Sequence, residues 1–379
     1  MSEAFIIAAR RTAVMPINGA FSELEAFELL SPVITALLQD ADMDASRVDR
    51  VIMGNALSGG GNVARVAALD ARLKESVSAL TVDTQCCAGL DAVGLASEIV
   101  KSGAADVIVA GGVESYSRAP RRIRRAKTAN EQDAEYERPA FTPWADRDPD
   151  MLEAAARLAK DLQISRSLQD DFAMESHQKA LKFREQVGAE IVPLLGQVND
   201  GATRALGKGL CDRLPGIAGE AGYELTSANT ALKADAAAAV LVVSENVVSE
   251  YTGHLNNPCE IAGYTTCGAD PENPALAPIS ALKALLDQSE LSAGQIDVVE
   301  MMEAFAVQAM VCLHRSGLAG QPFNLGGGAL ARGHPIGASG AINVVRLYHQ
   351  LQAFPAGSNG ISAIAAAGGL GSAMLLRQP

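Results

Sequence analysis

The chain has 379 residues, of which 48% are hydrophobic, and a formal net charge of -13 at pH 7. This length and apolar content are sufficient for one large ordered core or two fused cores. The acidic charge argues against nucleic acid or an anionic membrane as the main partner. No apolar run reaches the roughly 18 to 20 residues that span a bilayer, and no basic segment followed by a long apolar one begins the chain. We therefore expect a cytoplasmic protein.

The first half of the chain alternates short apolar strands with helices, as a mostly parallel sheet requires. Residues 51–53 and 106–110 are expected to be buried strands, and residues 79–84 form a β-rich run. An apolar helix is predicted over residues 89–101. The 35 glycines and the 4% aromatic content also favour an α/β protein over a β-sandwich.

A different kind of sequence follows at residues 119–162. It carries the basic run PRRIRRAK and then an acidic, proline-containing stretch without steady periodicity. This pattern predicts a surface excursion rather than a core element. Residues 166–184 return to a helical pattern. We interpret residues 119–225 as a loop subdomain inserted over the first half.

The second half repeats the α/β pattern after a link around residues 251–258. Pro278 starts a predicted helix, residues 296–300 and 361–366 are predicted strands, and residues 339–351 form the helix between these strands. Each half thus has a reactive residue, a helix and a strand expected to end in a Gly-Gly pair. This similarity indicates an internal duplication.

Two predicted turns, each between a strand and the helix that follows it, carry chemically reactive side chains. Cys86 lies in VDTQCCAGLDA, between the β-rich run and the helix, and His334 lies in GGGALARGHPIGASGA at residues 326–341. A thiol and an imidazole at two such turns indicate acyl transfer through a thioester. The amide dipoles at the helix start are expected to lower the pKa of Cys86 and to make it the first thiol alkylated. Cys87 is expected to pack in the core.

The six cysteines are too few and too scattered for a disulfide framework. No CxxC pair or His/Cys cluster indicates a metal site.

Several further segments make the chain resemble the thiolase family, the acyl-CoA enzymes that make or break a carbon–carbon bond beside a thioester. Besides the segments around Cys86 and His334, they are IIAARRTA (6–13), GGVES (111–115), SRSLQDDFAMESHQKA (165–180), MEAFAVQ (302–308) and GGLGSA (368–373), in family order. The resemblance covers almost the whole chain.

The resemblance implies a duplicated αβαβα layered fold. Its N-terminal half would span residues 1–250, including the insertion, and its C-terminal half residues 255–379. It implies that Cys86 carries the acyl group and that His334 activates it and helps bind the thioester oxygen. Backbone amides near Cys86 and near Gly369 would be further oxyanion donors. The substrate would be acyl-CoA or CoA, without a covalently bound cofactor, and the protein a homodimer or homotetramer.

Several positions depart from the family pattern. Ala365 stands where the family has a second cysteine that transfers a proton at carbon, and an alanine methyl cannot do this. Met302 stands where an asparagine orients an oxyanion-binding water, whereas a thioether is only a weak acceptor. Glu303, which is retained, is a candidate replacement base. The other departures are Asp83 and Ala88 beside the nucleophile, and Ala231 where a serine commonly contacts the coenzyme.

Because the protein is acidic overall, binding of the coenzyme A phosphates requires a local cluster of basic residues. The candidate patch consists of Arg121, Arg122, Arg124 and Arg125, for which the alternative is a solvated basic loop. His177, on the helix of the insertion, is expected to be structural.

Three functions are compatible with these residues. The first is a thiolase-like acyltransferase that forms an acyl-enzyme on Cys86 but has impaired or altered carbon–carbon chemistry. The alternatives are a degenerate acyl-CoA-binding subunit of a larger complex and a thioesterase-like enzyme.

Overall fold

The computed structural model describes residues 3–250 and 258–379, so most of the expected link at 251–258 lies outside the described residues. Within these ranges the dominant feature is an 11-stranded sheet. Nine of its strands lie in the order β11-β12-β13-β10-β1-β9-β5-β3-β4, while β2 pairs with β9 and β8 with β1. The strands are β1 (Ala4–Thr12), β2 (Met15–Pro16), β3 (Arg50–Gly54), β4 (Ser78–Val82), β5 (Val107–Glu114), β8 (Ile191–Val192), β9 (Ala234–Ser244), β10 (Cys259–Gly268), β11 (Val298–Met301), β12 (Asn359–Ala366) and β13 (Leu370–Arg377).

The sheet is mixed, so the expectation of a mostly parallel sheet is wrong. β3 pairs in parallel with β4 and β5, and β11 pairs in parallel with β12. However, β9 and β13 return antiparallel beside β5 and β12, and β1 pairs antiparallel with β10 where the halves join. The Gly111–Gly112 pair lies inside β5 rather than at its end, whereas Gly368 and Gly369 do follow β12.

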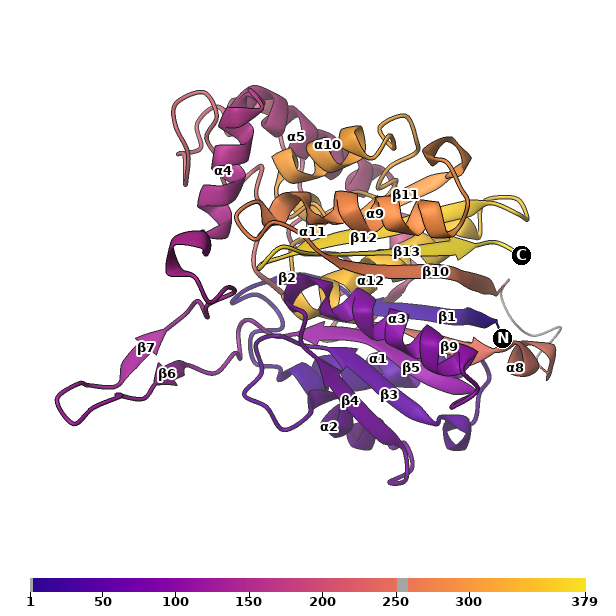
Figure 1. The fold of residues 1–379 in the computed structure, drawn as a ribbon. Coiled ribbons are helices and arrows are strands. Elements are labelled where there is room, and N and C mark those ends of the chain that lie inside the picture. Colours follow the sequence, from indigo (N-terminus) through magenta and orange to yellow (C-terminus); the bar gives the residue numbers. More distant parts are fainter. Residues whose placement is uncertain (1–2, 251–257) are drawn as a thin grey trace.

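Helices and half-sheets form five layers, which confirms the predicted αβαβα architecture (Figure 1). The central layer consists of α3 and α12, and its core contains side chains from strands of both halves. On the outer face of the N-terminal half, α1 and α2 cover a second core, and α9 with α10 covers a third on the C-terminal half. The helices are α1 (Ala26–Asp40), α2 (Val63–Asp70), α3 (Ala88–Lys101), α4 (Met151–Asp161), α5 (Arg166–Lys182), α6 (Arg184–Gly188), α7 (Lys208–Cys211), α8 (Glu245–Glu250), α9 (Ala277–Gln288), α10 (Ala306–Arg315), α11 (Ala329–Arg332) and α12 (Ile336–Leu351).

The two central helices approach each other closely because glycines line their contact. A methyl group on Gly89 of α3 would lie 2.7 Å from the carbonyl oxygen of Gly337, and one on Gly340 of α12 would lie 2.6 Å from the amide nitrogen of Leu90. Since both distances are shorter than a van der Waals contact, larger residues would push the helices apart. This packing brings the starts of α3 and α12, one from each half, together.

The insertion between β5 and β9 contains more regular structure than predicted. A hairpin of β6 (Arg122–Arg124) and β7 (Ala134–Tyr136) projects from the body of the molecule (Figure 1). The predicted surface excursion also contains α4, whose Asp150 side chain accepts hydrogen bonds from the amides of Leu152 and Glu153. This capped helix was not predicted from the sequence. The predicted helix over residues 166–184 is confirmed as α5 and the start of α6.

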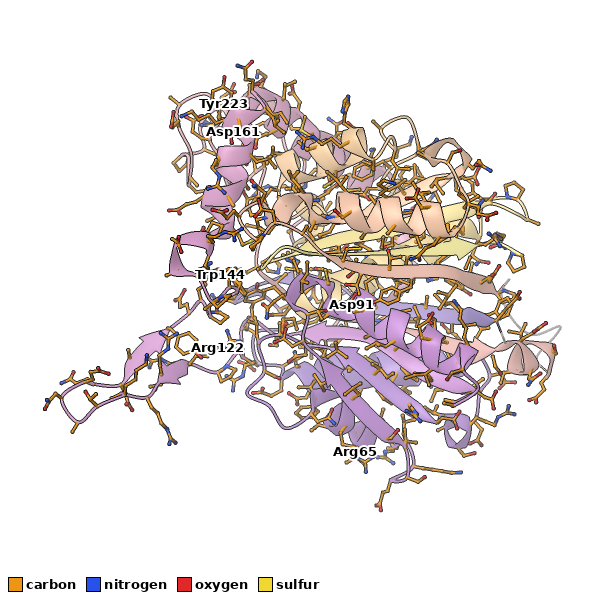
Figure 2. The ribbon with its side chains drawn as sticks, viewed as in Figure 1. Arg65, Asp91, Arg122, Trp144, Asp161 and Tyr223 are labelled. Atoms are coloured by element: carbon orange, nitrogen blue, oxygen red, sulfur yellow. The ribbon has the colours of Figure 1, made fainter. Side chains whose placement is uncertain are left out.

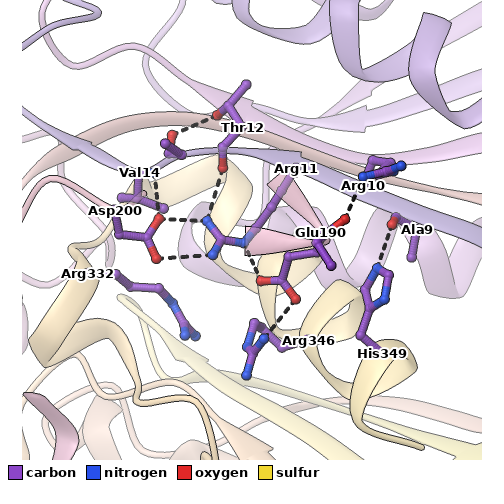
Figure 3. Close-up of polar contacts among 12 residues, drawn as sticks. Ala9, Arg10, Arg11, Thr12, Val14, Glu190, Asp200, Arg332, Arg346 and His349 are labelled. Atoms are coloured by element: carbon purple, nitrogen blue, oxygen red, sulfur yellow. Dashed lines mark hydrogen bonds and ion pairs between the residues drawn. The ribbon is translucent and has the colours of Figure 1, made fainter. Parts of the chain in front are cut away.

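A buried network of charges joins the two halves and the insertion (Figure 3). Arg11 of β1 contacts Glu190 at 2.6 Å and Asp200 at 2.7 Å, and Arg346 of α12 contacts Glu190 at 2.7 Å. Burial by itself would raise the pKa of Glu190. The positive charges of Arg346 and Arg11 have the larger effect and lower this pKa to about 2. Glu190 is therefore an ionised carboxylate between two arginines, and the network holds the three parts of the chain in register.

Candidate active site

Cys86 lies at the turn between β4 and α3, as predicted, within the short helix Gln85–Cys87. Gln85 has a positive φ of 57°, which is uncommon for a residue with a side chain. The carboxylate of Asp83 accepts hydrogen bonds from the Gln85 amide and side chain, both at 2.9 Å. Asp83, one of the departures from the family pattern, thus stabilises the tight turn that presents Cys86. Cys87 is fully buried in the central core, as expected.

His334 lies between α11 and α12, where its amide donates to the carbonyl of Leu232 at 2.7 Å. The Nδ1 atom lies 2.6 Å from Ser339 Oγ, and this hydroxyl donates to the carbonyl of Pro335 at 2.9 Å. Because the single hydroxyl hydrogen is already used, Ser339 accepts a hydrogen bond from Nδ1. In the neutral ring, Nε2 therefore carries the lone pair.

The two predicted reactive side chains meet. His334 Nε2 lies 3.2 Å from Cys86 Sγ, so the thiol can donate its hydrogen to the imidazole. Burial lowers the pKa of His334 to about 4, which keeps the ring neutral at pH 7.

The expectation that the helix start lowers the pKa of Cys86 is wrong. Burial raises the pKa of this thiol to about 12; hydrogen bonds from backbone amides lower it, and the carboxylates of Glu114 and Asp83 raise it further. The pair at rest is a neutral thiol beside a neutral imidazole. Proton transfer to His334 must therefore accompany attack on the substrate.

The backbone amides of Cys86 itself and of Ala367 lower the pKa of the Cys86 thiol. Ala367 belongs to the turn between β12 and β13. Gly369, the residue predicted from sequence for this turn, accepts a hydrogen bond at its carbonyl from the Ala269 amide at 2.7 Å. Its part in binding the thioester oxygen stays a prediction.

The insertion packs against this turn. A methyl group on Gly368, which has a φ of 79°, would lie 3.0 Å from the carbonyl oxygen of Phe141.

Ala365 and Met302, two of the positions that depart from the family pattern, are buried and apolar. Ala365 is 7% exposed and lies opposite Gly371, one residue before the end of β12. Met302 is 2% exposed in the central core, and its amide donates to the carbonyl of Ala363. Neither side chain supplies a group that transfers a proton. Ala231 is half-buried beside Ala304, to whose carbonyl its amide donates.

Glu303 is bound within the protein rather than presented to Cys86. Its carboxylate accepts from Ser176 Oγ and Asn324 Nδ2, each at 2.7 Å, and from the Leu330 amide at 3.2 Å. Burial raises its pKa. The carboxylate ties the insertion to the loop before His334, and among the described residues it contacts neither Cys86 nor His334. The structure therefore gives no support to Glu303 as the replacement base.

The four arginines do not form one patch. Arg121 forms an ion pair with Glu135, Arg122 donates to the carbonyl of Ala56 at 2.9 Å, and Arg124 lies over the ring of Tyr136. Figure 2 places Arg122 where the hairpin leaves the body. Of the four, Arg122 is thus the one turned back toward the N-terminal half. Arg125 is exposed on the hairpin.

The comparison with known families agrees with this geometry. The family model for the thiolase N-terminal domain matches residues 4–246, and that for the C-terminal domain matches residues 255–378. The chain belongs to the thiolase family.

Similar proteins and structures cover the whole of this thiolase. Two relatives are named "Putative acetyl-CoA C-acetyltransferase": VraB of Staphylococcus aureus, 34% identical with 99% of each chain covered, and YhfS of Bacillus subtilis, 36% identical with 98% of each covered. The acetyl-CoA acetyltransferase of Bacillus anthracis matches with a TM-score of 0.89 and 29% identity, over 100% of this chain and 99% of that one. Human mitochondrial 3-ketoacyl-CoA thiolase matches with a TM-score of 0.90 and 26% identity, over the same shares.

Ser339 was not predicted from the sequence to be the partner of His334. A signal was present, because Ser339 lies on the first turn of the predicted helix, five residues after His334.

His177 is buried, and its Nδ1 atom accepts from the amide of Arg204 at 3.2 Å, as a structural histidine would. Within residues 3–250 and 258–379, no helix is long and apolar enough to cross a membrane and no group of His, Cys, Asp or Glu is placed to hold a metal.

Proposed function

We propose that this thiolase-family acyltransferase forms an acyl-enzyme on Cys86 from an acyl-CoA and passes the acyl group to a second acceptor. The observation that carries the proposal is the 3.2 Å contact between Cys86 Sγ and His334 Nε2, with Nδ1 held by Ser339. This is the geometry of a nucleophile beside an oriented base.

In the proposed acylation step, His334 takes the thiol proton as the sulfur attacks the thioester carbonyl. The carbonyl carbon becomes tetrahedral, and its oxygen accumulates negative charge. The amides of Cys86 and Ala367, which lower the pKa of the thiol in the free enzyme, are the proposed donors to this oxygen. Collapse expels the CoA thiolate, which takes the proton from His334. Transfer of the acyl group to another thiol reverses these steps.

The same site is proposed to be weak in carbon–carbon chemistry. Claisen condensation removes a proton from the α-carbon of an acyl-CoA, and thiolysis returns one, whereas simple acyl exchange needs neither. Ala365 and Met302 supply no such group, and Glu303 is bound elsewhere.

We also propose a homodimer that uses the edge formed by β4. This strand is last in the sheet order, and its Leu80 is 49% exposed. Val66 and Leu69 of α2 are 40% and 44% exposed. An open, apolar strand edge is a surface that pairs with another chain.

The test is exchange between unlabelled butyryl-CoA and isotopically labelled CoA, without any other acceptor. The proposal expects labelled butyryl-CoA to form with the wild-type protein and not with Cys86→Ser. Binding of acyl-CoA without exchange would favour the alternative of a degenerate binding subunit. The loss of the proton-transfer group at Ala365 and of the water-orienting group at Met302 also allows this alternative. Net loss of butyryl-CoA to butyrate would favour a thioesterase.

A further inference from the structure

Tyr116 and Cys86 both follow the carboxyl-terminal ends of strands in the N-terminal half of the sheet. In the parallel strands β4, β3 and β5, Val82, Gly54 and Gly112 occupy one row. Cys86 follows Val82 by four residues, and Tyr116 follows Gly112 by four residues. Because all three strands run in the same direction, both residues lie beyond the same, carboxyl-terminal end of these strands.

The segment that carries Tyr116 also contacts the start of the helix that follows His334. A methyl group on Gly112 would lie 1.9 Å from the carbonyl oxygen of Gly337, so β5 passes directly against the start of α12. The Glu114 carboxylate then accepts the Gly337 amide at 3.0 Å. Tyr116 is therefore placed two residues beyond a point fixed to α12.

A second contact places Tyr116 beside the segment that pairs with His334. Lys233 forms a parallel bridge with His334, and its Nζ atom lies 5.8 Å from the centre of the Tyr116 ring. Burial raises the pKa of the Tyr116 phenol well above its usual value, and the charges of Cys86 and Glu114 raise it further, whereas Arg122 lowers it. The phenol is thus a protonated donor within the electrostatic reach of Cys86.

The hydroxyl of Tyr116 has no hydrogen-bond partner within the described part of the chain. A half-buried tyrosine ordinarily uses its hydroxyl. By contrast, Tyr264 donates to Asp91 at 3.0 Å and Tyr348 to the carbonyl of Ile7 at 3.1 Å. A free donor at this position is suited to a group on the substrate.

We propose that Tyr116 is the proton donor for the carbon–carbon chemistry that this site retains, in place of the proton-transfer group absent at Ala365. The proposal rests on the proposed function, because it requires an acyl group on Cys86.

In cleavage of a 3-ketoacyl-CoA, the Cys86 proton moves to His334 and the sulfur attacks the 3-keto carbon. The bond between C2 and C3 then breaks, and its electron pair remains on C2 as the enolate of acetyl-CoA. The Tyr116 hydroxyl gives its proton to C2, which releases acetyl-CoA. The phenolate regains a proton from the His334 imidazolium through water. The hydrogen lost by the thiol is thus balanced by the hydrogen gained at C2.

A single turnover with acetoacetyl-CoA tests this step, because two products on Cys86 are distinguishable by mass. Cleavage leaves an acetyl group, whereas attack on the thioester carbonyl, which needs no proton at carbon, leaves an acetoacetyl group. Acylation by butyryl-CoA, measured in parallel, reports the proposed function alone. Tyr116→Phe keeps the ring beside Lys233, and Tyr223→Phe, in the insertion (Figure 2), is the matched control.

We expect the wild-type protein and Tyr223→Phe to form acetyl-Cys86 and to release acetyl-CoA. In Tyr116→Phe the cleavage rate should fall by about 10²- to 10⁴-fold, so that the acetoacetyl adduct dominates, while butyryl transfer stays unchanged. An unchanged ratio of adducts in Tyr116→Phe would overturn the proposal. The proposal would also be overturned if the wild-type protein is acylated by butyryl-CoA but forms only the acetoacetyl adduct with acetoacetyl-CoA. If butyryl-CoA gives no adduct, the proposed function itself fails.

Discussion

The imidazole of His334 lies 3.2 Å from the sulfur of Cys86, although 248 residues separate them in the chain. Each side chain begins a central helix of its own half, and glycines bring the two helices together. The reactive pair is thus a direct product of the packing between the halves.

The neutral state of this pair predicts the pH dependence of Cys86 alkylation. His334, with its pKa lowered to about 4, stays neutral at pH 5 and above, and Cys86, with its pKa raised to about 12, stays a thiol until strongly alkaline pH. The rate of labelling by iodoacetamide should fall only below about pH 5 and rise steadily above pH 8. A flat rate between pH 5 and 9 would instead indicate a preformed thiolate and imidazolium.

Removal of the base should slow the reaction of Cys86 selectively. In His334→Asn, alkylation of Cys86 at pH 7.5 is expected to fall by about 10²- to 10⁴-fold, because no group remains to take the proton. Cys267, which is also half-buried, is an internal control in the same peptide digest. Ser339→Ala should give a smaller loss, since His334 keeps its ring but loses its orientation. Equal slowing of both cysteines would indicate a general structural effect.

The close packing of α3 and α12 predicts a cost for any side chain at Gly340. In Gly340→Ala the new methyl would lie 2.6 Å from the Leu90 amide nitrogen, which should destabilise the fold by about 1–3 kcal/mol and slow Cys86 acylation. Urea unfolding measures the first effect and intact mass the second. Gly209→Ala is the matched control, because a methyl there meets no atom within 4 Å. Equal stability of the two variants would contradict the account of the helix contact.

The buried network predicts sensitivity to acid. Because the pKa of Glu190 is lowered to about 2 in the folded protein, its contribution to stability is complete above about pH 4.5 and is lost as the pH falls toward 2. Glu190→Gln, which leaves Arg11 and Arg346 without their shared carboxylate, should lower the free energy of unfolding at pH 7 by roughly 3–5 kcal/mol. Urea unfolding at pH 7 and at pH 3 measures both effects. The variant should be less sensitive to acid than the wild-type protein, and an identical pH dependence would assign the acid sensitivity to other groups.

Restoring the missing groups predicts a gain of function. Ala365→Cys combined with Met302→Asn should raise the rate of acetoacetyl-CoA cleavage by about 10²- to 10⁴-fold, because a positioned acid is worth this much. Cleavage is followed by the loss of acetoacetyl-CoA in the presence of CoA. Ala366→Cys, at the adjacent buried position, is the control for an added thiol. A cleavage rate in the double variant no higher than that of the unmodified protein would contradict our account of the two positions.

A local sequence pattern predicted the elements that carry Cys86, because this residue stands between the β-rich run and a helical pattern. His334 was expected at a strand-to-helix corner, which is wrong, because it lies between α11 and α12. The direction of the strands was not predictable in the same way: β9 returns antiparallel through pairings across more than 100 residues. The α4 helix was missed because the irregular, proline-containing stretch before it was extended through residue 162, although Asp150 caps a helical pattern there. The low pKa expected of Cys86 was wrong because burial, which a local motif does not report, dominates. The arginine run was expected to act as one patch, whereas β6 directs its members to different partners.

Intact mass after incubation with butyryl-CoA is the most direct test of the central claim, that Cys86 carries the acyl group. We predict one butyryl adduct per chain, mapped to the peptide that contains Cys86, removed by added CoA and absent in Cys86→Ser. An adduct on another cysteine, or an equal adduct in Cys86→Ser, would contradict the claim.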